Sequence, residues 1–127
     1  MMAKMTKERR KDVRMKPNEL TFVALRPDFS RLGKVIDISR GGICFQYMVP
    51  ENHDALTEAL WVDVFLSTSS YYVPSVPCQL VYERRHQPGA FPIGMEYRQC
   101  GIRFADLTAD QSAQLSFYLA NHTAGRV

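Results

Sequence analysis

The 127-residue sequence lacks the features that mark membrane, secreted and disulfide-bonded proteins. No apolar run approaches the roughly 20 residues of a membrane-spanning helix, and no apolar segment follows the basic start as a signal peptide would require. The three cysteines, Cys44, Cys78 and Cys100, are odd in number, widely spaced and set among apolar residues. This pattern indicates buried thiols in a reducing compartment. We therefore expect a cytoplasmic protein that does not insert into a membrane.

The sequence is also poor in groupings of catalytic or metal-binding side chains. Its three histidines, His53, His86 and His122, show no ligand spacing to one another or to the cysteines. Ser39 has no neighbouring histidine that could act as its base. We therefore predict no catalytic residues, no metal site and no cofactor.

The net charge of +3 is unevenly distributed along the chain. Residues 1–16 carry seven basic and two acidic side chains, a net charge of +5, whereas the remaining 111 residues carry nine basic and eleven acidic ones, a net charge of −2. A cationic segment attached to a mildly acidic body indicates an anionic partner at that end. The alternative is a solvated tail whose charge only aids solubility.

Residues 1–16 have no apolar periodicity and are predicted to be a flexible basic arm, followed by a folded domain over residues 17–127. That domain begins with short segments rich in β-forming residues, each ended by turn residues. The predicted strands are residues 20–26, 33–38, 42–47, 61–66, 73–84 and 93–104. In the fifth segment, Val76, Cys78, Leu80 and Tyr82 are predicted to share one face. Pro74 and Pro77 restrict its first half to a sheet edge or a bulge.

Two stretches have helical character. Residues 52–60 are predicted to form one or two helical turns. Near the end of the chain, Thr108 and Gln111 form a capping box, and Leu115, Tyr118 and Leu119 form an apolar stripe. About six strands followed by one helix predict a mainly β protein: a small antiparallel β-barrel with the helix packed outside or across one mouth.

The basic arm contains a cluster of arginines. Arg10 and Arg14 are four residues apart, a spacing that directs both side chains to one side of a helix or of an extended strand, and Arg9 lies beside them. The planar guanidinium group matches phosphate oxygens, or the O6 and N7 atoms of guanine, with two parallel hydrogen bonds. These arginines are therefore candidate ligands for a nucleotide.

A second polar motif begins at the end of the second predicted strand. Asp37 and Ser39 share a side of the chain, and Gly41 and Gly42 come directly after them. A carboxylate can accept from the N1–H and amino group of guanine, a hydroxyl can donate to a phosphate oxygen, and glycines permit positive φ and close approach of backbone N–H groups to an anion. The same residues also suit an ordinary turn with glycines present only for its geometry.

The two motifs together resemble the PilZ domain family, which carries an Arg-x-x-x-Arg near its start and an Asp/Asn-x-Ser-x-x-Gly on the strands that follow. Arg10 and Arg14 match the first motif, and Asp37, Ser39 and Gly42 match the second; residues 100–104 resemble the late strand before the family's closing helix. The resemblance implies a bacterial receptor for cyclic di-GMP built on a six-stranded antiparallel PilZ-type barrel, which passes its signal to a downstream protein partner. It also implies that Arg10 and Arg14 bind phosphates and guanine edges, and that Asp37 and Ser39 bind a guanine and a phosphate. The arm is then expected to fold over the ligand.

Two alternative functions follow from the same residues. A small β-barrel with a basic arm can bind nucleic acid, but here the body is net acidic and no strand interleaves basic and aromatic residues. We therefore predict that nucleic acid is not the partner. The third possibility is a protein-interaction module that keeps the PilZ fold without binding nucleotide; an intact pair of motifs would be unexpected in such a module.

Overall fold

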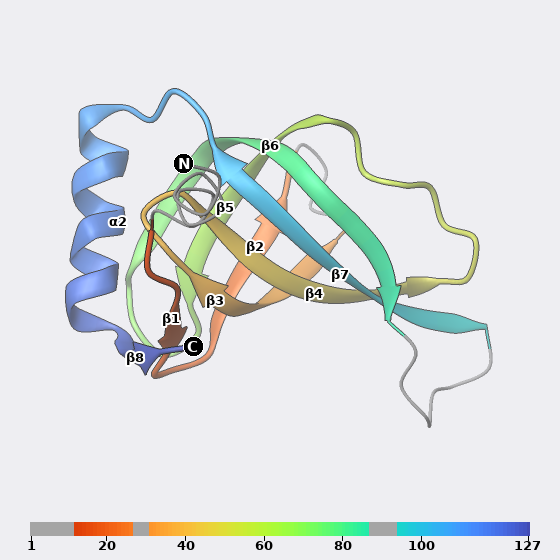
Figure 1. The fold of residues 1–127 in the computed structure, drawn as a ribbon, viewed down its shortest axis with the longest axis horizontal. Coiled ribbons are helices and arrows are strands. Elements are labelled where there is room, and N and C mark those ends of the chain that lie inside the picture. Colours follow the sequence, from red (N-terminus) through yellow and green to blue (C-terminus); the bar gives the residue numbers. More distant parts are fainter. Residues whose placement is uncertain (1–11, 27–30, 87–93) are drawn as a thin grey trace, which may run out of the picture.

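A computed structural model of the chain describes residues 12–26, 31–86 and 94–127. Six antiparallel strands form a closed barrel (Figure 1). Neighbouring strands pair in the order β2-β5-β6-β7-β4-β3, and β2 also pairs with β3, which closes the ring. The predicted six-stranded antiparallel barrel is therefore confirmed. Its strands are β2 (Thr21–Leu25), β3 (Leu32–Ile38), β4 (Gly42–Pro50), β5 (Ala59–Leu66), β6 (Tyr72–His86) and β7 (Met95–Phe104).

The interior of the barrel is filled by the inward-facing side chains of the strands. Many of them are β-branched, a shape that packs well on a pleated sheet. The fully buried valines come from three strands: Val23, Val62, Val64, Val73 and Val76. The largest buried rings are those of Phe45 and Tyr118, both 0% exposed. The strand periodicity read from the sequence thus corresponds to an inner apolar face.

Two bulges interrupt the long strand β6. Opposite β5, Val62 pairs with Val76 and Val64 pairs with Val73, so β6 has one extra residue beside Pro74. The predicted bulge at this proline is confirmed. Opposite β7, a second register shift lies between Leu80 and Tyr82.

The second bulge makes one sequence prediction wrong. Leu80 pairs with the buried Ile102, but Tyr82 pairs with Gly101, and a Cβ added to Gly101 would lie 2.3 Å from the Tyr82 ring. Gly101 is on the outer face because its neighbours along β7 point inward. The extra residue, Val81, therefore turns Tyr82 to the outside of the barrel, away from the face shared by Cys78 and Leu80.

The helical turns predicted for residues 52–60 are also wrong: this segment has no helix, and β5 begins at Ala59. Its backbone groups bond to distant side chains. Arg98 donates to the carbonyl oxygens of residues 53 and 54, and the Leu56 N–H donates to Glu83 (2.8 Å). These tertiary hydrogen bonds satisfy groups that a helix would have paired internally, and nine residues without an apolar stripe offer little to favour a helix.

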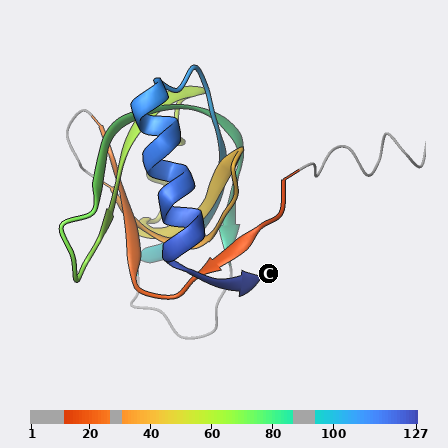
Figure 2. The same cartoon turned by 90° about the vertical axis from the view of Figure 1, so that its left-hand side faces the viewer.

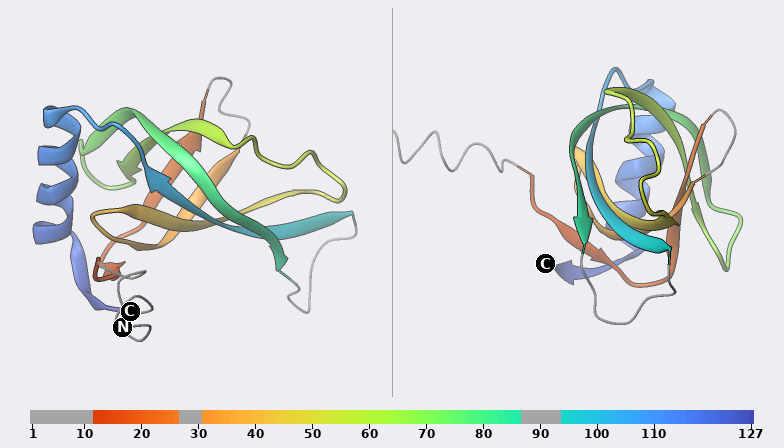
Figure 3. Two further views of the ribbon diagram at one scale, coloured as in Figure 1. Left: turned by 45° about the horizontal axis from the view of Figure 1, so that its top comes forward. Right: turned by 90° about the vertical axis from the view of Figure 1, so that its right-hand side faces the viewer.

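A helix closes one end of the barrel. Helix α2 (Ala109–Asn121) lies across the barrel opening (Figures 2 and 3). The predicted capping box is present: the Thr108 side chain accepts from the Gln111 N–H, and the Gln111 side chain accepts from the Thr108 N–H, both at 3.0 Å. Leu115 and Tyr118 are buried against the barrel core, and Leu119 is partly buried there. The predicted helix, its start and its apolar stripe are confirmed.

Two short strands extend the sheet beyond the barrel. Strand β1 (Met15–Pro17) pairs with β3 and with β8 (Thr123–Arg126), which follows α2. Neither strand is apparent in the sequence pattern, because each is too short to show alternation. Strand β1 includes the last two residues of the predicted arm and so joins the arm to the sheet.

Candidate functional site

The turn between β3 and β4 is built by Ser39, as one reading of the sequence allowed. Its N–H donates to the Gly42 carbonyl oxygen (2.9 Å), and its Oγ accepts from the Gly41 N–H (3.1 Å). The Phe104 N–H donates to the Gly41 carbonyl oxygen (2.8 Å), which ties the turn to the end of β7. A hydroxyl that accepts one hydrogen bond still has a proton to donate, so the turn presents a donor at a fixed position.

A bulge in β3 places Asp37 on the outer face of the barrel. Val35 pairs with Phe45, and Asp37 pairs with Cys44, so Ile36 is an extra residue in β3. Val35 and Ile38 are buried in the core, whereas Asp37 shares the outer face with Cys44. Only 6% of Asp37 is exposed. Asp37 thus lies just before the Ser39 turn, held by strand pairing on a rigid part of the sheet.

The two glycines of the motif allow close approach. Neither Gly41 nor Gly42 has a positive φ, so the conformational freedom that glycine permits is not used at either position. A Cβ on Gly42 would lie 2.1 Å from the Ile102 carbonyl oxygen, and one on Gly41 would lie 2.5 Å from the Asp12 carboxylate. Gly42 therefore lets β4 pack against β7, and Gly41 lets the end of the arm approach the turn.

The base of the arm lies beside these residues. Met15 of β1 pairs with Ile38, directly before Ser39, so the preceding Arg14 is next to the motif turn. Burial raises the pKa of the Cys44 thiol; the Asp37 carboxylate raises it further, while the Arg14 guanidinium opposes the shift. Both charges therefore act on the same part of the outer face. Arg9 and Arg10, the other predicted arginines, lie outside the described residues.

Three side chains that the sequence did not assign to the site also belong to this outer face: Cys44, Tyr82 and Gln99. Tyr82 Oη lies 3.4 Å from Cys44 Sγ, and Gln99 Nε2 donates to Tyr82 Oη at 3.2 Å. Burial is the main cause that raises the pKa of Tyr82. The alternation of β7 could have indicated Gln99, because it is two residues from the outward-facing Gly101. Tyr82 could not be assigned, since the bulge that turns it outward has no local sequence signal.

Further cations border the same face. Arg103 pairs with Gly42 across β4 and β7, is exposed, and hydrogen-bonds Gln79. The Arg84 guanidinium carbon lies 5.2 Å from the centre of the Tyr82 ring. With Arg14, these two arginines surround a region that contains aromatic, amide and hydroxyl groups. Such a combination can bind an anion that also carries a flat hydrogen-bonding ring.

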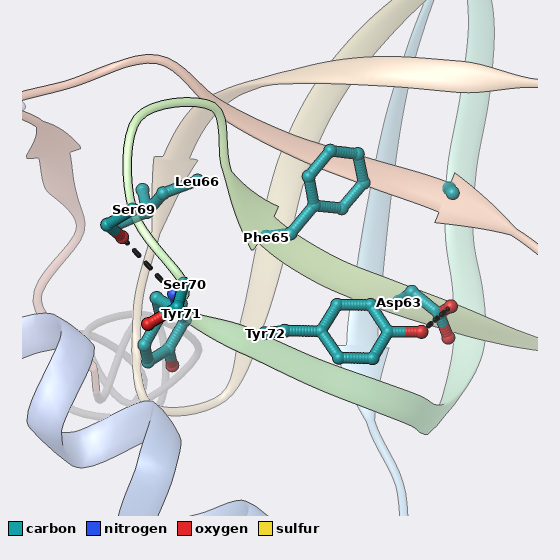
Figure 4. A pocket seen from close by; sticks show the side chains of 8 residues that line it. Asp63, Phe65, Leu66, Ser69, Ser70, Tyr71 and Tyr72 are labelled. Atoms are coloured by element: carbon teal, nitrogen blue, oxygen red, sulfur yellow. Dashed lines mark hydrogen bonds between the residues drawn. The ribbon is translucent and has the colours of Figure 1, made fainter.

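A hollow of about 500 Å³ lies elsewhere, over β5 and the start of β6 (Figure 4). Phe65 and Tyr72 line it, and Asp63 lies at one end. Arg26 donates to both Asp63 oxygens (2.7 and 3.3 Å), and Tyr72 Oη and the Ser75 N–H also donate to it. Although burial acts to raise the pKa of Asp63, the hydrogen bonds led by Arg26 lower it overall. A carboxylate held ionised by four donors is poorly suited to act as a base.

Two features are absent from the described part of the chain, a metal-binding cluster and a membrane-spanning helix. Among residues 12–26, 31–86 and 94–127, no three His, Cys, Asp or Glu side chains are grouped so that they could hold a metal ion. Within the same ranges no helix has the length and apolar character needed to cross a membrane. The outer face beside the motif turn supplies hydrogen-bond donors, acceptors and the positive charge of Arg14 and Arg103 on a rigid sheet.

The model of the PilZ domain family matches residues 8–121, and the chain therefore belongs to this family. Two solved structures are similar in fold. The PilZ domain of YcgR from Escherichia coli, solved with c-di-GMP, has a TM-score of 0.62 and 15% identity, with 85% of this chain and 86% of that one covered. MrkH, described as a c-di-GMP-dependent transcription regulatory factor, has a TM-score of 0.63 and 17% identity, with 88% of this chain and 50% of that one covered.

The TM-scores establish a shared fold. The sequence identities are too low to show that the ligand is shared as well. None of the curated proteins compared with the sequence matches it. The family match begins at residue 8 and so includes the arginine motif as well as the turn motif.

Proposed function

We propose that this protein is a receptor for cyclic di-GMP and that its site is the outer face beside the motif turn. The observation that carries the proposal is that Arg14, the last residue of the arginine motif, lies beside a turn motif more than twenty residues later in the chain. Arg14, Asp37 and Ser39 lie together because β1 pairs with β3 next to the turn. Both similar solved structures are described as binding or depending on c-di-GMP, which supports the same ligand here.

Each site residue has a role that its chemistry supports. Asp37 accepts from the N1–H and amino group of a guanine, and Ser39 donates its hydroxyl proton to a phosphate oxygen. Arg9, Arg10 and Arg14 bind phosphates and the O6 and N7 edge of guanine. Gly41 and Gly42 keep the turn surface open, since a side chain on either would meet neighbouring atoms.

We further propose that the arm, residues 1–16, moves about its base in β1 while residues 17–127 act as the rigid domain. The net charge of +5 on the first segment attracts the anionic ligand, and binding orders this arm over the barrel. The new surface formed by arm and ligand then contacts a downstream protein partner. The protein acts in this way as a cytoplasmic adaptor in a bacterium and catalyses no reaction.

Isothermal titration of the purified chain with cyclic di-GMP tests the proposal. The wild type is expected to bind at tens of micromolar or below, and Arg14→Asp is expected to abolish binding while circular dichroism and Tm are unchanged. Gln114→Glu, which adds a negative charge on α2 away from the motif turn, is the control and should bind like the wild type. Absence of heat with the wild type would refute the receptor function.

The same variants distinguish the nucleotide from nucleic acid. Asp37→Ala removes the group proposed to recognise guanine but leaves every positive charge in place. Binding of single-stranded DNA or RNA that depends on salt and persists in both Asp37→Ala and Arg10→Ala would instead identify a nucleic-acid-binding protein. We expect Asp37→Ala to lose cyclic di-GMP binding.

A further inference from the structure

The last strand of the chain pairs with the base of the proposed ligand-binding arm. The Val127 N–H donates to the Arg14 carbonyl oxygen (3.0 Å). Strand β8 then continues along β1 in antiparallel register, as three residue pairs show: Met15 with Arg126, Lys16 with Gly125 and Pro17 with Thr123. The backbone of Arg14 is thus held by residues more than 100 positions later in the chain.

The contacts continue beyond β1 into the barrel. The Asn18 N–H donates to the His122 carbonyl oxygen (3.0 Å), and His122 Nδ1 lies 3.2 Å from a Glu19 carboxylate oxygen. One turn earlier in α2, Tyr118 Oη lies 2.7 Å from Thr21 Oγ1. Residues 14–21 therefore run along the end of α2 and β8, with contacts from Arg14 through to Thr21. We call residues 118–127 the C-terminal brace.

Strand β1 is flanked by two strands in the described part of the chain, β3 on one side and β8 on the other. It pairs with β3 at one position, Met15 with Ile38, but with β8 at three. It is only three residues long, and Pro17 has no N–H to donate. A strand of this length cannot keep its position alone, so the pairing with β8, together with the pairing with β3, fixes where Arg14 lies.

The brace itself is firmly attached to the barrel. Tyr118 is 0% exposed, and Thr123 Oγ1 donates to the Leu119 carbonyl oxygen (2.7 Å), which binds the start of β8 to α2. The His122 ring packs among aromatic rings, with centroids 5.6 Å from Tyr118 and 5.7 Å from Tyr71. A shift at the end of α2 would therefore move β8, and with it the base of the arm.

From these contacts we infer that strand β8 is a positioning element for ligand binding and is coupled to it. The inference rests on the proposed cyclic di-GMP site. Pairing with β8 holds Arg14 beside Asp37 and Ser39, so loss of the pairing lowers affinity without removing any group that touches the ligand. Because linkage is reciprocal, ligand bound to the arm also stabilises the pairing of β8. Strand β8 thus connects the ligand site to the end of α2.

Gly125 provides a point variant that weakens β8 alone. Its φ is +132°, and an added Cβ would meet no atom within 4 Å, so Gly125→Val strains the backbone of β8 without a clash at Cβ. Gly94 is the matched control, since its φ is +87° and its surroundings are equally open, but it precedes β7 at the end of the barrel away from α2 (Figure 1). A chain ended at His122 removes β8 entirely.

Titration with cyclic di-GMP should show Kd raised by about fivefold or more in Gly125→Val and in the chain ended at His122, in line with typical coupling between sites. Gly94→Val should bind like the wild type. The three altered proteins, Gly125→Val, Gly94→Val and the chain ended at His122, should have similar Tm values. Ligand should also slow hydrogen exchange at the Val127 amide, a readout that a purely structural strand would not change.

Wild-type affinity in both β8 variants, or exchange at Val127 that does not respond to bound ligand, would refute the coupling and leave the receptor function standing. A wild-type chain that does not bind cyclic di-GMP would refute both proposals together. Faster exchange at the Lys16 amide in the chain ended at His122, measured without ligand, is expected in addition. Such faster exchange would show directly that β8 holds the base of the arm in place.

Discussion

At the scale of single residues, Gly42 allows β4 to lie closer to β7 than any other residue would permit. We predict that Gly42→Ala lowers the free energy of unfolding by about 1–3 kcal/mol, because the Cβ would lie 2.1 Å from a backbone oxygen that cannot rotate away. Urea denaturation measures the change. Gly41→Ala is the matched control: its Cβ meets the flexible Asp12 side chain, so we expect a change within about 0.5 kcal/mol. Equal effects would contradict this account.

Asp63 is predicted to make stability depend on pH. Hydrogen bonds from Arg26, Tyr72 and Ser75 hold its pKa below the ordinary value, so it stabilises the fold above the unfolded pKa of about 4 and loses this contribution as pH falls through its folded pKa. Asp63→Asn should lower the free energy of unfolding at pH 7 by about 1.5–3 kcal/mol and flatten the loss of stability in acid.

Urea unfolding of Asp63→Asn at pH 7 and at pH 3 measures both effects. The control is Asp54→Asn, because the side chain of Asp54 is exposed and the hydrogen bonds that it receives from Arg31 and Arg98 go to its carbonyl oxygen. An Asp63→Asn protein as stable as the wild type at pH 7 would show that the network around Asp63 contributes nothing net.

Residue roles were predictable from the sequence only where local chemistry decides them. The hydrogen bond from the Gly41 N–H to Ser39 Oγ spans two residues, and an ordinary turn at this position was one of the two interpretations of the motif. The reason for Gly42 was not predictable, since it lies in the backbone of Ile102, sixty residues away. The part of Arg9 and Arg10 in the site stays a prediction.

At the scale of elements, α2 depends on its first turn. Thr108→Ala removes the side-chain acceptor for the Gln111 N–H and should lower the free energy of unfolding by about 1 kcal/mol. Thermal or urea denaturation gives the measurement. Ser116→Ala, on the exposed side of the same helix, should cause no loss, because alanine is the better helix former. A loss as large for Ser116→Ala would show that the effect is not capping.

Elements with a clear internal period were predicted, and those maintained by distant partners were not. The capping box and apolar stripe of α2 are set by residues three or four positions apart, so the pattern was sufficient. Residues 52–60 have their backbone groups bonded to Arg98 and Glu83, and no local pattern reports those bonds. Strands β1 and β8 are each too short to be stable alone, so β8 depends on its pairing with β1, and β1 depends on its pairing with both β8 and β3.

At the scale of the whole molecule, ligand binding should raise the stability of the entire barrel. A ligand that binds only the folded state adds about 2.7 kcal/mol at a concentration 100 times its Kd. We therefore predict that cyclic di-GMP raises Tm by several degrees in the wild type and has no effect in Arg14→Asp. Differential scanning fluorimetry over a range of ligand concentrations gives the shift, and GTP serves as a ligand control. An equal shift with GTP would show that the site recognises only negative charge.

The barrel also separates two surfaces. In the ring of strands, β3, β4 and β7 carry the motif face, while β5 lies across from β4 and β2 lies across from β7. The hollow lined by Phe65 and Tyr72 is on the latter side. A ligand on the motif face and a contact on the other side therefore need not compete. Among the described residues, Arg14, Arg84 and Arg103 supply positive charge at the motif face.

The sequence by itself determined the mainly β class, the closed ring of six strands, the capped helix and the family, because alternation, turn residues and motif spacing are local or nearly local properties. Tertiary structure alone decided which residues meet. The bulge at Val81 turned Tyr82 to the outer face, and the bulge at Ile36 did the same for Asp37. The pairing of β8 with β1 brought residue 127 to Arg14. These features depend on hydrogen bonds between backbone segments far apart in the chain, whose register no short stretch of sequence encodes.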